Sequence, residues 1–322
     1  KQRKSKRMYF QNFLDLNKMF NENPQYLRDT VRRSIMSSTF TGEWRKDPEE
    51  YYAADFMFPD SKTEFDKNFL DPVAKEKLLH GGWADEEGNV KTKIEYKINS
   101  HGFRSKHFDE EDRPIVCFGC SFTYGVGLPE EYTWPDMVSK HFDIPVYNLG
   151  VPGMGLDIAS IYATNWLVDE IWRPRAICVL LPPPGRIDFF VPQETHMPPP
   201  TNYRLVNLWH DVEHNEDRPN KTTKQLVESI PFTSYLMQRR NAQTLKLLAN
   251  YLSIPFAYAD TIYTDIHPTD QRILNSEPLA RDLKHAGVDW QKRVANHIIK
   301  QLDSYPDSNW KEYGDLLPYS EI

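Results

Sequence analysis

The stretch Ile115-Val-Cys-Phe-Gly-Cys-Ser-Phe-Thr-Tyr-Gly125 decides the fold that we expect for this chain. It begins with an apolar run of strand length, Ile115 to Phe118, and continues through a glycine into small and hydroxyl residues. Short apolar runs bounded by turn residues are typical of buried strands, and open parallel sheets form their sites beyond the carboxyl ends of such strands. The stretch therefore predicts a buried strand that delivers the side chain of Ser121 to the edge of a sheet.

The chain downstream of Pro114 alternates short apolar runs with helical periods, which is the pattern of a parallel sheet with crossover helices. Besides the first strand, we expect strands at three further runs: Val146 to Leu149, Ala176 to Leu181 and Ile254 to Ala259. Amphipathic helices are expected in four places: after the N-cap candidate Thr133, across Ile158 to Trp166, from near Ser234 to Leu252, and across Val294 to Leu302. The fold class that follows is α/β, a three-layer α/β/α sandwich.

Residues 1–112 are expected to form an N-terminal accessory region. It contains a predicted helix across Tyr26 to Met36 and a β-hairpin or strand at 83–99. The evidence for the strand is the alternation of apolar and charged residues from Val90 to Ile98. Just after it, Gly102 and Arg104 are interpreted as a turn glycine and an arginine that ties the loop down.

The remaining chain divides into a domain and a tail. Residues 113–302 form the predicted α/β domain, and the weakly periodic stretch from about Gly185 to Pro231 is expected to be a long insertion within it. Residues 303–322 are polar with scattered aromatic residues and form the predicted C-terminal tail.

Composition and charge exclude several classes of protein. The 322 residues carry a formal net charge of -7, whereas a nucleic-acid platform needs a clustered excess of Lys and Arg. The basic opening Lys1 to Arg7 is interpreted as a frayed terminus. No apolar run is long enough to span a membrane. The three cysteines, Cys117, Cys120 and Cys178, are an odd number in a long chain, so we expect free thiols and a soluble protein of the cytoplasm.

Polar residues that support serine chemistry are expected at one edge of the predicted sheet. The loops after the first three strands carry Ser121, Gly153 and Arg186, and Asp282 and His285 precede the last helix. A serine hydroxyl is a weak nucleophile unless a base removes its proton, and the base needs an acidic partner that fixes its tautomer. Because Asp282 and His285 are three residues apart, they lie side by side in a turn or in a first helical turn. This spacing suits a Ser-His-Asp triad.

The sequence resembles the SGNH, or GDSL-like, hydrolase family over about Asn99 to Leu302. The similar blocks occur in the family's order: Gly119-Cys-Ser-Phe-Thr123 with Cys120 in place of aspartate, Thr133-Trp-Pro135, Tyr147-Asn-Leu-Gly-Val-Pro-Gly153, and Asp282-Leu-Lys-His285. The resemblance implies a parallel, flavodoxin-like sheet. It also implies an oxyanion hole that includes the backbone N–H groups of Ser121 and Gly153, and a reaction that needs no metal or cofactor.

The third block of the family is where this sequence departs from the pattern. Gly-x-Asn-Asp is expected after the third strand, but the chain has Leu181-Pro-Pro-Pro-Gly-Arg-Ile-Asp188 there. The asparagine that supplies a side-chain oxyanion donor is absent, and losing one such donor typically costs roughly 10²- to 10³-fold in kcat. Two interpretations of Arg186 stay open. Its guanidinium replaces the missing donor, or it pairs with Asp188 or another carboxylate.

Other residues also admit two interpretations. Cys120 is either a packed small residue or a reactive thiol. Asp265 and His267 imitate the Asp-His block with a spacing one residue too short, which makes them a rival acid–base pair. His210 and His214 have a spacing that binds zinc on a helix, but they lie in a polar, proline-flanked segment. A solvated loop and no metal site are therefore expected there.

The resemblance implies a serine esterase that hydrolyses a small-molecule or carbohydrate ester, with an O-acetyl group on a carbohydrate as the first expected substrate. A non-catalytic binding or structural module on the same fold stays open, as does an acyltransferase that uses the same residues. Cys120, the lead-in Asn99-x-x-Gly-Phe-Arg104 and Arg186 resemble SGNH-type proteins of tailed bacteriophages. That likeness implies a virion-associated or host-surface-modifying esterase.

Overall fold

The structure is a computed structural model that describes residues 52–56, 60–99, 102–109, 113–157, 160, 174–183, 186–192, 203–207, 221–260, 278–306 and 310. The predicted helix at 26–36, the one at 158–166 except for Ser160, the histidines at 210 and 214 and the rival pair at 265 and 267 lie outside these residues. Within the described part of the chain, no helix combines the length and the apolar character needed to cross a membrane.

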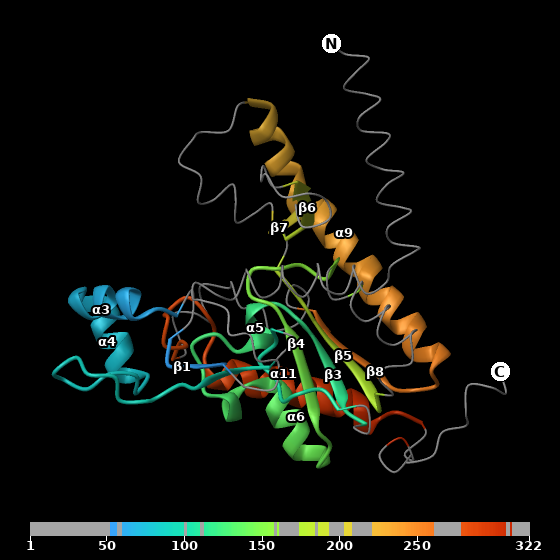
Figure 1. Ribbon diagram of the computed structural model, residues 1–322, viewed down its shortest axis with the longest axis horizontal. Coiled ribbons are helices and arrows are strands. Elements are labelled where there is room, and N and C mark those ends of the chain that lie inside the picture. Colours follow the sequence, from blue (N-terminus) through green and yellow to red (C-terminus); the bar gives the residue numbers. More distant parts are fainter. Residues whose placement is uncertain are drawn as a thin grey trace.

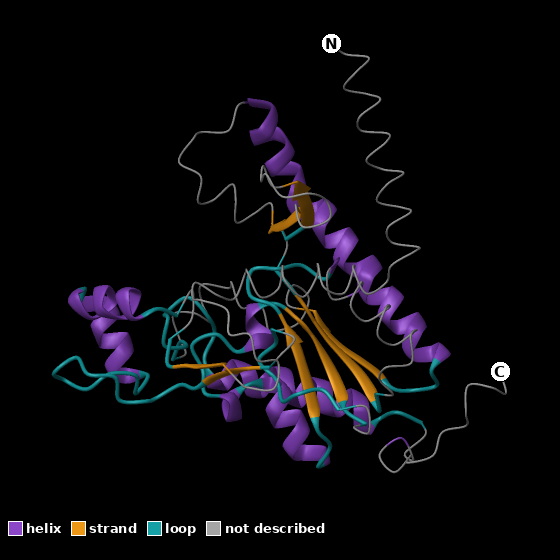
Figure 2. Cartoon of the chain, viewed as in Figure 1, coloured by secondary structure: helices purple, strands orange, loops and turns teal. Residues whose placement is uncertain are grey.

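A parallel sheet of four strands forms the centre of the molecule (Figures 1 and 2). Its strands are β3 (Ile115–Gly119), β4 (Val146–Gly150), β5 (Ala176–Leu181) and β8 (Phe256–Asp260). All four predicted strands are confirmed, although β8 begins two residues later than expected. The order across the sheet is β4-β3-β5-β8. The chain adds β4 on one side of β3 and then crosses back to add β5 and β8 on the other side, as in a flavodoxin-like sheet.

Helices cover both faces of the sheet. Alternate residues of the strands face α6 (Trp134–Phe142) and α11 (Val288–Asp303) on one side and α9 (Lys221–Tyr251) on the other. The two central strands, β3 and β5, are buried throughout, because each face of the sheet has its own apolar core. The expected layers of helix, sheet and helix are present. The helices predicted after Thr133 and across Val294 to Leu302 are confirmed as α6 and α11.

The stretch expected to be an insertion contains regular structure. An antiparallel hairpin is formed by β6 (Asp188–Pro192) and β7 (Tyr203–Asn207), and α9 begins at Lys221, well before Ser234. Pro231 lies inside α9, although proline removes one helical hydrogen bond and is normally a mark of a helix boundary. The prediction of a late helix start was wrong because it treated this proline as the end of the loop.

The described part of the N-terminal region packs against the α/β domain. Its elements are β1 (Tyr52–Ala54), α3 (Lys62–Leu70), α4 (Pro72–His80) and β2 (Tyr96–Ile98). Of the β-hairpin or strand predicted at 83–99, Ala84 and Val90 form an antiparallel bridge and Tyr96–Ile98 pair antiparallel with β1, while residues 92–95 between them belong to no strand. The alternation of burial is nevertheless present, because Ile94 and Tyr96 enter a core that also contains Tyr124 and Ala280.

Candidate active site

Ser121 is the first residue of α5 (Ser121–Tyr124), a single helical turn that follows β3. Two glycines let this turn lie directly on the ends of the strands. A Cβ atom at Gly119 would lie 2.1 Å from Thr123 Oγ1, and one at Gly150 would lie 2.4 Å from the backbone nitrogen of Tyr124. Any side chain at either position would push the turn off the sheet. The predicted delivery of Ser121 to the carboxyl edge is confirmed.

Arg104 holds the loop that follows α5. Its side chain is buried, and its Nη1 donates to the carbonyl of Gly125 at 2.7 Å and its Nη2 to that of Leu128 at 2.9 Å. These bonds fix the backbone just beyond Ser121, because a buried guanidinium presents several donors in a rigid plane. The interpretation of Arg104 as a residue that ties a loop down is confirmed, although the loop concerned is that of α5.

Asp282 and His285 lie together in a turn that joins two antiparallel residues, Leu279 and Ala286. Asp282 Oδ1 accepts the backbone N–H groups of Lys284 at 3.2 Å and of His285 at 3.1 Å. Its other oxygen, Oδ2, lies 2.5 Å from His285 Nδ1. The same carboxylate thus closes the turn and binds the imidazole, as aspartate commonly does in local turns.

The turn is packed against the helix that carries Ser121. The imidazole of His285 meets the ring of Phe122 edge to face, with 5.1 Å between the ring centroids. The N–H of Arg281 donates to the carbonyl of Gly127 at 2.9 Å, in the loop after α5. From α11, Gln291 Nε2 donates to the carbonyl of Phe122 at 3.0 Å. Three separate contacts therefore hold the Asp282 turn and the start of α11 against the segment from Phe122 to Gly127, and one of them joins His285 to the residue next to Ser121.

Residue Ser121 is 2% exposed. Its Oγ is buried and has no hydrogen-bond partner among the described residues. The hydrogen bond from Ser121 to His285 that an assembled triad contains is therefore not formed in this structure. Catalytic hydrogen bonds are often long or badly aligned before substrate binds, so the geometry alone does not remove either residue as a candidate.

The electrostatics of the pair favour an ionised Asp282. Burial of its carboxyl raises its pKa, but the charge of His285 and the hydrogen bonds from His285 and Lys284 outweigh burial, so the pKa lies below its ordinary value. An ionised carboxylate at Nδ1 holds the proton on that nitrogen and leaves Nε2 as the acceptor. This is the tautomer that a general base needs.

Cys120 is a packed core residue. It is fully buried in the core between the sheet, α6 and α11, and its thiol is free, as are those of Cys117 and Cys178. The expectation of free cysteines is confirmed. Burial raises the pKa of Cys117 well above its ordinary value, which makes it a poor thiolate nucleophile.

Gly153 and Arg186 lie on two loops that α9 ties together. Gly153 has φ of +78°, and a Cβ placed on it would meet nothing within 4 Å. The Gly155 N–H on the same loop donates to Asp188 Oδ1 at 2.8 Å, which links the loop after β4 to the first residue of β6. Arg186 Nη1 is buried without a hydrogen-bond partner in the described part of the chain, and no ion pair there joins Arg186 to Asp188.

Two buried amides of α9 were not singled out by the sequence. Asn241 Nδ2 donates to Asp157 Oδ1 at 2.8 Å, and Gln238 Nε2 donates to the carbonyls of Pro183 and Arg186 at 3.3 Å each. Gln238 is 1% and Asn241 6% exposed, although both are polar. The sequence does contain a pattern that could have indicated them, because the two amides are three residues apart on the otherwise apolar face of an expected helix. Polar side chains on a buried face usually have hydrogen-bond partners in the protein.

The described residues contain no group of three or more His, Cys, Asp or Glu side chains that could hold a metal ion.

Comparison with known proteins adds little. No family model matches the chain, and no curated protein does. Among solved structures, it is similar to a chain from Desulfitobacterium hafniense that is assigned to the G-D-S-L family of lipolytic proteins. The alignment covers 59% of this chain and 100% of that chain, with 14% sequence identity and a TM-score of 0.28.

This likeness is too weak to support a role for any site residue. It also gives no support to the resemblance to SGNH-type proteins of tailed bacteriophages. The case for the site therefore depends on the contacts between the described residues themselves.

Proposed function

We propose that this chain is a serine hydrolase that cleaves an ester. Ser121 is the nucleophile, His285 is the general base and then the general acid, and Asp282 orients His285. The observation that carries the proposal is the hydrogen-bonded Asp282 and His285 pair, whose imidazole packs on the residue next to Ser121. A buried serine, a base and an ionised orienting acid at the carboxyl edge of a parallel sheet form the arrangement that activates a hydroxyl.

The reaction has two halves. Ser121 Oγ attacks the ester carbonyl as its proton passes to His285 Nε2, and the tetrahedral intermediate collapses with loss of the alcohol, which takes that proton. Water then gives a proton to Nε2 and attacks the acyl-serine, and collapse releases the acid and returns the proton to Oγ. Substrate binding must first bring Oγ and Nε2 into hydrogen-bond distance, because this bond is absent from the present structure.

The oxyanion in this proposal is held by the backbone N–H groups of Ser121 and Gly153 and by the guanidinium of Arg186. Support for Arg186 comes from its buried Nη1, which has no partner among the described residues. A donor left in a buried position costs free energy unless a ligand or a transition state uses it. A guanidinium also carries a full charge, so it replaces a neutral asparagine amide with a stronger donor.

The substrate class proposed is an acetyl or other small acyl ester of a carbohydrate, which extends the family resemblance and depends on it. Transfer of the acyl group to a sugar hydroxyl would use the same residues with an alcohol in place of water. The unbonded Ser121 hydroxyl favours one further candidate, a non-catalytic module on the same fold.

One experiment separates an enzyme from a binding module. The full chain is treated with a fluorophosphonate probe and assayed with p-nitrophenyl acetate, beside Ser121→Ala and His285→Ala. Ser304→Ala is the matched control, because Ser304 lies at the exposed end of α11. We expect labelling and turnover in the wild type and the control and neither in the two site variants. Equal labelling of wild type and Ser121→Ala, or no labelling of any protein, would reject the esterase.

A further inference from the structure

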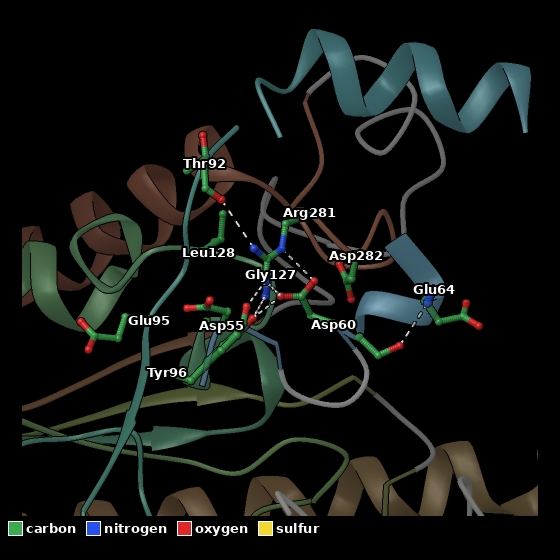
Figure 3. A network of polar contacts seen from close by, with 12 residues as sticks. Asp55, Asp60, Glu64, Thr92, Glu95, Tyr96, Gly127, Leu128, Arg281 and Asp282 are labelled. Carbon is green, nitrogen blue, oxygen red and sulfur yellow. Dashed lines mark hydrogen bonds and ion pairs between the residues drawn. The ribbon is translucent and has the colours of Figure 1, made fainter. Parts of the chain in front are cut away.

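A buried ion pair lies directly beside the candidate acid. Arg281 precedes Asp282 in the chain, and its side chain is 0% exposed, while that of its partner Asp60 is 1% exposed. Arg281 Nη2 donates to Asp60 Oδ2 at 2.6 Å and Nε donates to Oδ1 at 3.1 Å, so the two planar groups meet side by side (Figure 3). Such two-pronged pairing fixes orientation as well as distance.

The rest of the guanidinium is bound by the N-terminal region. Nη2 also donates to the carbonyl of Asp55 at 2.5 Å, Nη1 donates to that of Thr92 at 3.5 Å, and Cζ lies 4.1 Å from the centroid of the Phe56 ring. Figure 3 shows the Arg281 side chain among Asp55, Asp60 and Thr92. Residues that are 189 to 226 positions away in sequence therefore surround one side chain of the active-site turn.

The network closes on the loop that follows Ser121. Tyr96 Oη donates to Asp60 Oδ2 at 2.6 Å and accepts the N–H of Gly127 at 2.8 Å. The carbonyl of the same Gly127 accepts the backbone N–H of Arg281 at 2.9 Å. The hydrogen bonds thus run from Gly127 through Tyr96, Asp60 and Arg281 back to Gly127, and the closed ring fixes the Asp282 turn against the nucleophile's loop.

Stability is a poor explanation for this network. A buried ion pair loses so much hydration that well-packed apolar residues of similar size are often as stabilising or more so. Burial indeed raises the pKa of Asp60, although Arg281 and Tyr96 both act to lower it. What the charged network supplies, and an apolar contact does not, is one fixed position for the backbone at Arg281. The next residue in the chain is Asp282.

We propose that Arg281 and Asp60 are positioning residues that hold the Asp282 and His285 pair in register with Ser121. On this inference, which rests on the proposed esterase function, the N-terminal region is part of the active-site framework. Neither residue touches the reacting atoms, and both act through the backbone of the turn.

A second ion pair offers a matched control, because it joins the same two segments at the surface. Lys284 Nζ lies 3.3 Å from Glu64 Oε2, with the two side chains 57% and 34% exposed. Exposed pairs of this kind contribute little to stability and do not fix geometry tightly. Glu64→Gln therefore removes a link between the N-terminal region and the turn without touching the buried network.

The test uses two variants of the buried pair in the full chain. Arg281→Lys keeps the charge opposite Asp60 but loses the planar fork, and the double variant Asp60→Leu with Arg281→Met removes both charges so that neither is left buried alone. Turnover of p-nitrophenyl acetate is expressed per active site, counted by the extent of fluorophosphonate labelling at completion. Hydrogen exchange of the peptide covering 278–287 is measured in parallel.

We expect kcat to fall about 10- to 100-fold in both variants, with KM within about twofold of wild type, because a small displacement of a catalytic group can cost on the order of 10²-fold. Exchange at 278–287 should be faster in both, and Glu64→Gln should match the wild type in every measurement. Wild-type kcat per site in either folded variant would overturn the positioning role, as would a loss that only tracks the unfolded fraction.

Failure of the proposed function itself gives a different result. If the wild type neither labels nor turns over, the esterase proposal is rejected and the catalytic positioning role with it, whatever the variants do. If the wild type is active and the buried-pair variants match it, the esterase stands and only the inference about Arg281 and Asp60 is overturned.

Discussion

His285 Nδ1 lies 2.5 Å from Asp282 Oδ2, and the other oxygen of Asp282 accepts two backbone N–H groups of the same turn. One side chain therefore shapes the turn and orients the base. The two functions use different oxygens, so a substitution can remove one and spare the other.

Asp282→Asn tests that separation. The amide oxygen of asparagine can still accept the two N–H groups, so the turn should persist, but the remaining NH₂ group favours the wrong imidazole tautomer. We expect kcat for p-nitrophenyl acetate to fall by roughly 10³- to 10⁴-fold with the fold retained by circular dichroism. Asp289→Asn, at an exposed position on α11, is the control and should be fully active. Retention of a tenth or more of wild-type kcat would contradict the assigned role.

The same residue should make the fold sensitive to acid. The folded-state pKa of Asp282 lies below its ordinary value of 3.8, since the contacts with His285 outweigh burial. A depressed carboxyl pKa contributes stability that is fully present above the unfolded-state pKa and is lost as the pH falls through the folded-state value. Urea unfolding at pH 6, 5, 4 and 3 should therefore show a shallower loss of stability below about pH 4 in Asp282→Asn than in wild type. Parallel curves for the two proteins would rule this contribution out.

Arg186 offers a direct test of the oxyanion proposal. Arg186→Ala should lower kcat roughly 10²- to 10³-fold with little change in KM, because a donor of this kind acts mainly in the transition state. Arg186→Lys should recover part of the loss, since it keeps the charge without the fork. Lys292→Ala, at an exposed position of α11, serves as the control. If Arg186→Ala changed kcat no more than the control does, the interpretation would fail.

The sheet and the two helices of one face were predictable because their signals are local. Apolar runs bounded by Gly and Pro marked β3, β4 and β5, and helical spacing of apolar residues marked α6 and α11. The region from Val90 to Ile98 has the alternation of a strand, but it pairs only at its two ends, Val90 with Ala84 and β2 with β1, because pairing is a property of the tertiary structure. The early start of α9 was missed because Pro231 gives a breaker signal inside a helix.

The candidate site likewise contains a local contact that the sequence predicts and long-range contacts that it does not. Asp282 and His285 are three residues apart, so their contact follows from turn geometry and could be expected from the sequence alone. Asp60 and Arg281 are separated by 221 positions, and nothing in the local sequence of either indicates the other. The same holds for Asn241 and Asp157, which are 84 apart. Residues that support a site from a distance therefore became visible only in three dimensions.

Asn241→Leu tests whether α9 holds the oxyanion loop. Asn241 Nδ2 donates to Asp157 Oδ1 at 2.8 Å from a position that is 6% exposed, and leucine has nearly the same shape without the donor. Leaving the partly buried Asp157 carboxylate, whose side chain is 15% exposed, without that bond should cost about 1 to 3 kcal/mol, measured as a lower urea midpoint with an unchanged m value. Because Asp157 lies on the loop of Gly153, kcat per folded site should also fall several-fold.

Gln301→Leu is the comparison for this substitution. Gln301 Nε2 donates to the carbonyl of Tyr258 at 2.8 Å, but the bond is exposed, so water can replace it and the cost should be small. A lower urea midpoint without a change in kcat per site would assign Asn241 to stability alone. Equal midpoints for the two variants would show that the contact with Asp157 does not hold the loop. The expected result is a loss of both stability and turnover in Asn241→Leu, because α9 binds the loops after β4 and β5 through polar side chains that have no other buried function.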